Sequence, residues 1–197
     1  MKGIIFNAVE DAVTTLYSED TWDDLLDAAG IEGTYTSLGN YRDEDLQALV
    51  VAGCELTGMD AEELVRTLGR YAFPHLSSRY PELLGDASTT HDFLRRVNDI
   101  IHPEVLKLHP DAKPPEFEFE QRGDDVLRVT YRSTRKLGVL AEGLMIGAGD
   151  HFAETVTVEV VEGAGTEVTV FDVHATANEL ATTNELATTN QAADAVG

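Results

Sequence analysis

Cysteine and basic residues are scarce in this 197-residue sequence, and each shortage excludes a class of protein. Cys54 is the only cysteine, so the chain cannot form an internal disulfide. Only 14 residues are basic against 36 acidic ones, which gives a formal net charge of -22 at pH 7. A surface of that charge repels nucleic acid phosphates and anionic lipids, so we expect neither nucleic acid nor a membrane among the partners.

Long apolar runs are missing as well. No window approaches the ~18 uninterrupted apolar residues that suggest a membrane-spanning helix. The apolar start of the chain is interrupted by Asn7 and followed by Glu10 and Asp11, so we do not expect a signal peptide. Together with the single cysteine, these absences predict a cytoplasmic protein.

Hydrophobic residues nevertheless make up 43% of the chain, which is enough for a sizeable core, and the N-terminal half is patterned as helices. Capping residues predict one helix over residues 22–29 and another from Asp43 to near Gly58. Asp60 is predicted to start a further helix by accepting a hydrogen bond from the amide of Glu63.

His102 lies beside the apolar stripe of a helix predicted over residues 90–108, and Pro103 follows it directly. Pro103 cannot donate a hydrogen bond back to Asp99, and its ring disfavours α geometry at His102, so we expect the helix to kink or restart here. A histidine in this position is ordinarily a core residue bonded to the backbone. A kink beside it can also aim a ring nitrogen at a metal.

Zinc is one candidate metal, with His109 and Asp111 as further ligands. In a continuous helix the separation of His102 and His109 is roughly 10 Å, which is too far for both rings to bind one ion at ~2 Å. The sequence has no CxxC or HExxH motif either. A lone imidazole among aliphatic residues instead favours a metal that brings its other ligands with it, as haem iron does.

The C-terminal half changes to a period of two, which predicts strands. One hairpin is expected over residues 117–132, and a second hairpin turns around residues 162–165. Apolar residues at helical spacing over residues 137–148 predict a helix between the hairpins. A helical half followed by an antiparallel sheet with a helix on it is an α+β architecture.

Tyr131, Ser133 and Arg135 alternate at the end of a predicted strand, so their side chains are expected ~6.6 Å apart on one face. Two hydroxyls and a guanidinium form a row of donors, and the guanidinium can bind a carboxylate through two parallel hydrogen bonds. On its own, this is also the pattern of a polar strand edge. Combined with His102, it suits the propionates of a haem.

Three segments occur in a telling order: MKGIIF at the start, HPEVLKLHPDAKPPEF, and then the YxSxR motif that begins at Tyr131. In these segments the sequence resembles the H-NOX family, the haem-based sensors of nitric oxide and oxygen that include the sensory domain of soluble guanylate cyclase. The resemblance covers residues 1–176. It implies an N-terminal helical subdomain packed on a C-terminal subdomain with a four-stranded antiparallel sheet and helices, with haem between the two.

Residues 177–197 fall outside the resemblance. They contain two copies of NELATT, at residues 178–183 and 184–189, with no aromatic or basic residue to anchor them. We therefore predict a low-complexity C-terminal tail that is a frayed helix or a disordered extension.

The resemblance implies a bound haem b (iron protoporphyrin IX) with His102 as the axial iron ligand. The YxSxR residues would hold the propionates. Pro115 matches a family proline that presses on the macrocycle, and Ile5 matches a residue whose bulk helps to distort it. Ordinary core packing is the alternative explanation for Pro115 and Ile5.

Leu140 stands where oxygen-binding members of the family resemble one another in having a distal tyrosine. Leucine donates no hydrogen bond, and bound oxygen gains more from a donor than nitric oxide does, so the expected ligands are nitric oxide and also carbon monoxide. Tyr41 and Tyr71 could still reach the pocket, which leaves oxygen binding open. The expected distal wall consists of Val9, Ala72, Leu140 and Leu144.

The expected function is sensing without catalysis. Nitric oxide is expected to weaken the bond from iron to His102, so that the haem relaxes and the proximal helix moves. We expect no output domain in this chain, and the resemblance implies a separate partner such as a histidine kinase or a cyclic-di-GMP enzyme. The alternative is an oxygen-binding or peroxide-reacting haem protein, for which the candidate distal acids or bases are His75, His91, His151 and His174.

Overall fold

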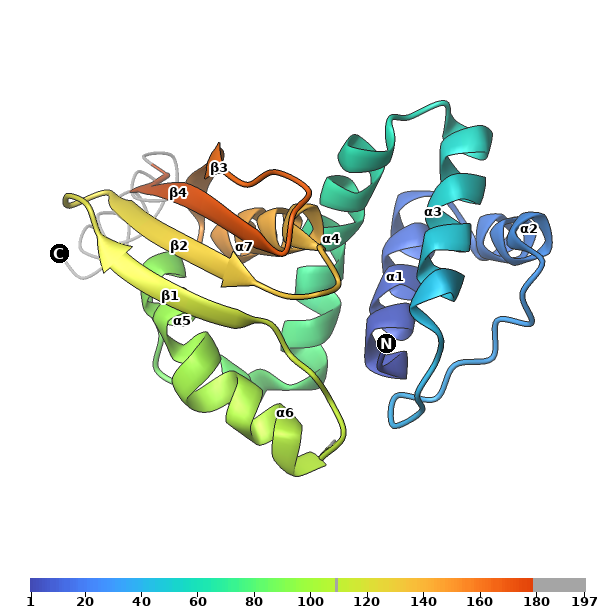
Figure 1. Ribbon diagram of the computed structural model, residues 1–197, viewed down its shortest axis with the longest axis horizontal. Helices are drawn as coiled ribbons and strands as arrows, with labels where there is room; N and C mark the ends of the chain where they lie inside the picture. The colour runs from blue at the N-terminus through green and yellow to red at the C-terminus, as the bar shows by residue number, and fades with distance from the viewer. Residues whose placement is uncertain (109, 179–197) are drawn as a thin grey trace, which may run out of the picture.

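The computed structural model describes residues 1–108 and 110–178, and it has the expected α+β architecture (Figure 1). Its helices are α1 (Gly3–Leu16), α2 (Glu19–Ala29), α3 (Asp43–Thr57), α4 (Ala61–Arg79), a short 3-10 helix (Pro81–Leu83), α5 (Thr90–Arg96), a π-helical segment (Val97–Ile101), α6 (His102–Leu108) and α7 (Gly138–His151). Its strands are β1 (Glu116–Gln121), β2 (Val126–Arg132), β3 (Glu154–Glu162) and β4 (Val168–Ala177). Most of the predicted tail, residues 179–197, lies outside the described residues.

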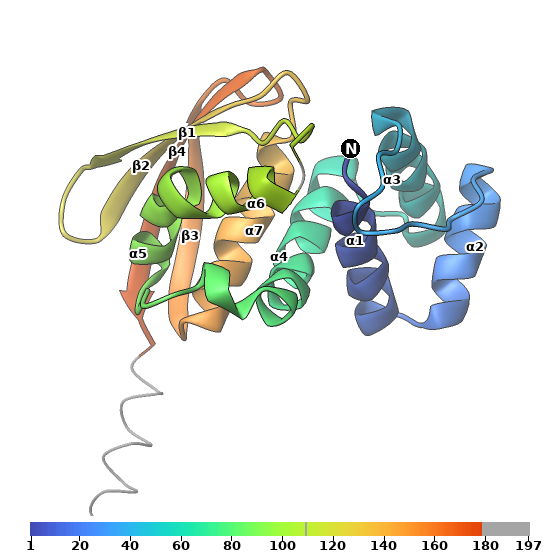
Figure 2. The same cartoon turned by 90° about the horizontal axis from the view of Figure 1, so that it is seen from below.

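Helices α1 to α3 form an N-terminal helical unit at the end of the molecule away from the sheet (Figure 2). Its core includes Phe6 and Trp22, which are buried together with leucines of α2, α3 and α4. The ring of Phe6 stacks on Tyr35 of the loop before α3, with centroids 4.2 Å apart. The loop between α2 and α3 is therefore packed against α1.

The glycine ends of the predicted helices are confirmed, but the helix predicted over residues 22–29 begins earlier, at Glu19, because Ser18 caps it by accepting from the amide of Thr21. Gly58 closes α3 in the left-handed conformation, with φ of 72°, where a side chain would be strained. Asp60 caps α4, but its carboxylate accepts from the amide of Glu62 at 2.8 Å, and the expected bond from Glu63 was wrong. A cap oxygen can satisfy either of these free amides, so the sequence pattern does not choose between them.

The four strands form one antiparallel sheet in the order β1-β2-β4-β3. Helices α5 to α7 cover one of its faces (Figures 1 and 2). Alternate residues point to this face and are buried, because side chains on a strand alternate between the two faces. The buried set in the two central strands comprises Leu127, Val129, Tyr131, Thr169, Phe171, Val173 and Ala175.

Helix α4 packs more extensively on α7 than on α1 or α3. The two helices approach closely at glycines: a Cβ built on Gly143 would lie 2.2 Å from the carbonyl oxygen of Arg66. Ion pairs also join them, from Arg66 to Glu142 at 2.6 Å and from Arg70 to Asp150. The sequence changes from helical to strand periodicity near residue 110, but the two halves do not pack as separate units, because α4 lies against α7, which covers the sheet.

None of the helices in the described part of the chain is both long enough and apolar enough to span a membrane.

Gly143→Ala should destabilise the fold, because the new methyl group would have to displace backbone atoms of α4. We expect a loss of about 1–3 kcal/mol in the free energy of unfolding, the usual cost of overpacking. Urea denaturation of the haem-free protein measures it, with Glu55→Ala on the exposed face of α3 as the control. Equal midpoints for the two variants would show that the helices can separate at no cost.

Candidate functional site

The helix predicted over residues 90–108 is three segments in the structure: α5, the π-helical segment and α6, which begins at His102. The amide of His102 donates to the carbonyl of Val97, five residues back. The predicted break is confirmed, and the wider π-helical turn makes room beside Asp99 for the ring of Pro103. His102 itself has φ of -64° and ψ of -40°, so the expectation that Pro103 would disfavour α geometry there was wrong.

His102 is largely buried against β1. Its ring stacks on Phe117 with centroids 5.9 Å apart, and a hydrogen bond links it to the backbone of Pro115. Burial lowers the pKa of His102 to about 4, while the bond to Pro115 opposes the shift. Proline has no amide hydrogen, so the imidazole must donate to the carbonyl of Pro115. The other ring nitrogen of the neutral imidazole then carries a lone pair that can bind a metal.

The described residues contain no group of three or more histidine, cysteine, aspartate or glutamate side chains placed to hold a metal ion. Asp111, the zinc ligand considered above, instead contacts Lys2 and Asn40. His109 lies outside the described residues. A metal bound by His102 would have to bring its remaining ligands with it, as a porphyrin does.

The YxSxR motif is a strand end followed by a turn. Tyr131 lies in β2, which ends at Arg132, whereas Ser133 and Arg135 lie in the connection to α7. The amide of Lys136 bonds to the carbonyl of Ser133, and Lys136 has a positive φ of 56°. The expected alternation of all three side chains along one strand was therefore wrong, because the chain turns after the second position.

The two hydroxyls of the motif remain able to donate. The buried hydroxyl of Tyr131 accepts a hydrogen bond from the amide of Leu137 at 3.2 Å, which fixes the start of α7. Ser133 Oγ accepts from the amide of Arg135 at 3.3 Å. Neither hydroxyl proton has a partner among the described residues, so each can serve a carboxylate.

Arg135 connects three parts of the chain. Its Nε donates to Asp43 at 2.9 Å, and its Nη1 donates to the carbonyl of Lys113 at 2.8 Å. Asp43 also accepts from the amino group of Met1 at 2.6 Å. Burial raises the pKa of Asp43, but the N-terminal ammonium group and Arg135 together lower it. A guanidinium has five N–H donors, so Arg135 keeps some for a further carboxylate.

Asp43 and Phe117 are the contacts that the sequence did not indicate. Asp43 belongs to an acidic first turn of a helix, which is a common pattern that names no partner. Phe117 is recognisable only as the apolar position of an alternating strand. It contacts both His102 and Tyr131, whose ring centroid lies 5.6 Å away, and so connects the two halves of the candidate site.

The candidate distal residues lie on three neighbouring helices. Leu140 and Leu144 belong to α7, where it touches α4 at Gly69, and the buried Ala72 follows on α4. Val9 on α1 is buried in the core of the N-terminal helical unit, where it lines a small apolar cavity of about 30 Å³.

Ile5, Leu140 and Leu144 are half-buried and belong to neither of the two core clusters formed by the described residues. His102 and Pro115 also keep some exposure to solvent. Apolar side chains left between two cores fit a flat apolar group, and the donors of the YxSxR motif fit its carboxylates. The residues present therefore suit a haem.

The two tyrosines considered as hydrogen-bond donors to bound oxygen have other surroundings. The hydroxyl of Tyr41 accepts from the amide of Thr36 at 2.7 Å, and Tyr71 is 39% exposed. The histidines considered as distal acids or bases also have other neighbours. His75 contacts Asp11, His91 bonds to the carbonyl of Val173, His151 packs on Phe73, and His174 pairs with Thr157 across the sheet.

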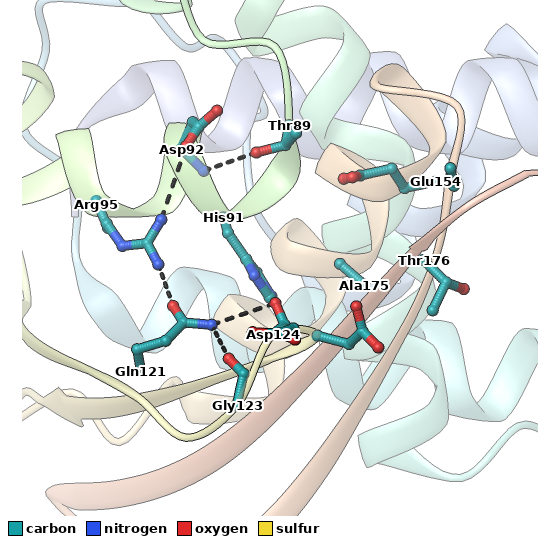
Figure 3. Close-up of a pocket in the computed structure, with 12 residues that line it drawn as sticks. Thr89, His91, Asp92, Arg95, Gln121, Gly123, Asp124, Glu154, Ala175 and Thr176 are labelled. Carbon is teal, nitrogen blue, oxygen red and sulfur yellow. Dashed lines mark hydrogen bonds and ion pairs between the residues drawn. The ribbon is translucent and has the colours of Figure 1, made fainter.

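A separate polar hollow of about 590 Å³ opens where α5 meets the β1–β2 turn and the end of β4 (Figure 3). Arg95 and Gln121 bond to each other there, and the buried His91 is held by β4. None of the proposed haem-binding residues lines this hollow. Its size alone does not make it the functional site.

Comparison with protein families identifies one match, described as haem-NO-binding (HNOB), over residues 2–160. Among curated proteins, soluble guanylate cyclase gcy-31 of Caenorhabditis elegans is 23% identical over 138 residues. The match covers 69% of this chain but 20% of that protein, so the chain spans about a fifth of its relative.

Solved structures with the same fold include two H-NOX proteins. One from S. oneidensis, in the Fe(II)NO ligation state, is 26% identical with a TM-score of 0.81, and the match covers 89% of this chain and 99% of that one. One from K. algicida, in the unliganded Fe(II) state, is 28% identical with a TM-score of 0.77, and the match covers 91% of this chain and 98% of that one.

Acid should destabilise the haem-free protein through His102. Its pKa is 6.5 ordinarily and about 4 when folded, so between these values the unfolded chain binds the extra proton and stability falls as pH falls. Full burial would make this loss about 3 kcal/mol, and partial solvent contact reduces it. Urea unfolding at about pH 7 and about pH 5 should show a smaller loss in His102→Leu than in the parent. Equal losses would mean that His102 is not the titrating group.

Proposed function

We propose, from the premise that this chain belongs to the haem-NO-binding family, that it senses nitric oxide through a ferrous haem b. Members of the H-NOX family are haem-based sensors of nitric oxide or oxygen. The single observation that carries it is His102, a neutral buried imidazole with one nitrogen bonded to Pro115 and the other available to iron.

The remaining residues have roles that follow from their chemistry. Tyr131, Ser133 and Arg135 would hold the two propionates, and Pro115 and Ile5 would press on the faces of the macrocycle. When bound, the haem would supply an iron that takes a diatomic gas, and His102 would hold that iron. The chain itself supplies a neutral ligand, carboxylate donors and an apolar enclosure.

The apolar wall favours nitric oxide and carbon monoxide over oxygen. Leu140, Leu144, Val9 and Ala72 have no donor, and bound oxygen depends on one more than the other two gases do. Tyr41 and Tyr71 are the donors that could change this preference. The hydroxyl of Tyr41 accepts from the amide of Thr36, and Tyr71 is 39% exposed, which supports an apolar wall without them.

The output is a movement of α6, which carries His102, passed to a separate signalling protein such as a histidine kinase or a cyclic-di-GMP enzyme. We assign no catalytic residue. A net charge of -22 favours a basic contact surface on that partner. We do not propose cyclase activity for this chain, because the match covers a fifth of the guanylate cyclase.

His102→Gly should weaken haem binding more than about tenfold, since it removes the axial ligand itself. Free imidazole should restore binding by filling the space left by the side chain. Haem titration and the absorption spectrum of the reduced protein measure both effects. His75→Ala changes a histidine of α4 whose ring contacts Asp11 and Thr15 of α1, and it should bind haem like the parent with or without imidazole. Parent-like affinity and spectrum in His102→Gly without imidazole would refute the axial assignment.

Leu140→Tyr should raise oxygen affinity by about tenfold or more, because a hydroxyl can donate to bound oxygen. Leu140→Phe is the matched control, as it adds the ring without the hydroxyl. Oxygen equilibrium titrations of the reduced variants give the comparison, and carbon monoxide binding verifies that each pocket stays intact. If tyrosine and phenylalanine give the same oxygen affinity, residue 140 does not face the bound gas.

A further inference from the structure

The carboxylate of Asp111 joins two segments of the N-terminal helical unit to the loop that follows α6. Lys2 donates to its Oδ1 at 2.5 Å, and the side-chain amide of Asn40 donates to its Oδ2. Lys2 and Asn40 are also paired by a backbone bridge. The three residues come from the start of α1, the loop before α3 and the loop before β1.

The environment of Lys2 makes this contact more than a surface ion pair. The Lys2 side chain is only 11% exposed, whereas lysine is rarely buried without a counter-charge. Asp111 is itself 58% exposed, so water can stabilise it without Lys2. Removing the carboxylate therefore destabilises the contact mainly by leaving the buried Lys2 ammonium group without a counter-charge. The bonds from Lys2 and Asn40 lower the pKa of Asp111 to about 2, so the carboxylate stays charged at any physiological pH.

The position of Asp111 in the chain connects this contact to the helix that carries His102. It lies between the end of α6 and Pro115, whose carbonyl accepts the bond from His102. The carbonyl of Lys113, in the same loop, holds Arg135. A displacement of α6 must therefore pass through a loop that is bonded to α1 and to the loop before α3.

We propose that Asp111 transmits movement of α6 to the N-terminal helical unit through Lys2 and Asn40. The proposal rests on the proposed function only for the origin of that movement. Hydrogen exchange of the full-length, haem-loaded protein, with and without nitric oxide, tests it in the parent and in Asp111→Asn. In the parent, nitric oxide should change exchange in α6 and also in residues 36–42. In Asp111→Asn, the change in α6 should persist and the change in residues 36–42 should be lost.

Glu104→Gln is the matched control. It makes the same chemical change and breaks a pair of the same length, 2.5 Å, but its partner Lys107 lies on the same helix. Its response should equal that of the parent in both segments. A response of residues 36–42 that survives in Asp111→Asn overturns the proposal, as does loss of the α6 response in that variant, which would place Asp111 in the gas site itself.

A haem-free measurement separates this inference from the proposed function. Without haem, Asp111→Asn should still speed exchange in residues 36–42 relative to Glu104→Gln. Lys2→Met should have the same effect, and the double variant should add nothing further, because both changes break one contact. Additive effects would show that Lys2 and Asp111 do not act through one contact, and would overturn the proposal. If the protein binds no haem but the variants show this non-additive increase in exchange, the proposed function fails and the contact of Asp111 with Lys2 and Asn40 is still supported.

Discussion

The rest of the site depends on the burial of His102 and on its hydrogen bond to the backbone of Pro115. Burial keeps the His102 ring neutral, with a pKa of about 4, and the carbonyl of Pro115 fixes which nitrogen carries the hydrogen. Pro103 contributes by forcing the helix to restart at this residue, through a π-helical segment that absorbs the distortion. A charged ring in this position would repel a metal, and a ring without the carbonyl bond would be free to rotate.

The other constraint is that the molecule has two apolar cores with partly buried apolar side chains between them. One core belongs to the N-terminal helices, and the other lies between the sheet and α5 and α7. Ile5 comes from the first region, and Leu140 and Leu144 come from the second, yet none of the three is a member of either core cluster. Exposing apolar surface of this kind to water is unfavourable in free energy. A flat apolar cofactor that covered it would therefore stabilise the arrangement of the two regions.

The sequence predicts elements well because strand alternation and helix caps are local signals, and both hairpins and the glycine end of α3 lie where these signals place them. Details that depend on geometry are less predictable. The carboxylate of Asp60 accepts from the amide of Glu62 and not from that of Glu63, and the YxSxR motif turns after Arg132 although its spacing is that of a strand. Contacts such as that of Asp43 with Arg135 could not be predicted, because with 36 acidic residues no local pattern selects the one that a given arginine meets.

The scarcity of basic residues has a structural consequence. With 14 of them in the chain, several of those that form close pairs connect different elements: Lys2 with Asp111, Arg135 with Asp43, Arg66 with Glu142, and Arg70 with Asp150. The first two join the N-terminal helices to the loops around the site, and the last two join α4 to α7. Four of the 14 basic residues thus lie at these junctions. A movement of α6 relative to the N-terminal helices would act on the Lys2–Asp111 pair, and both pairs are exposed enough for salt to weaken them. The same charge distribution that leaves the outer surface acidic therefore makes the relation between the two units sensitive to ionic strength.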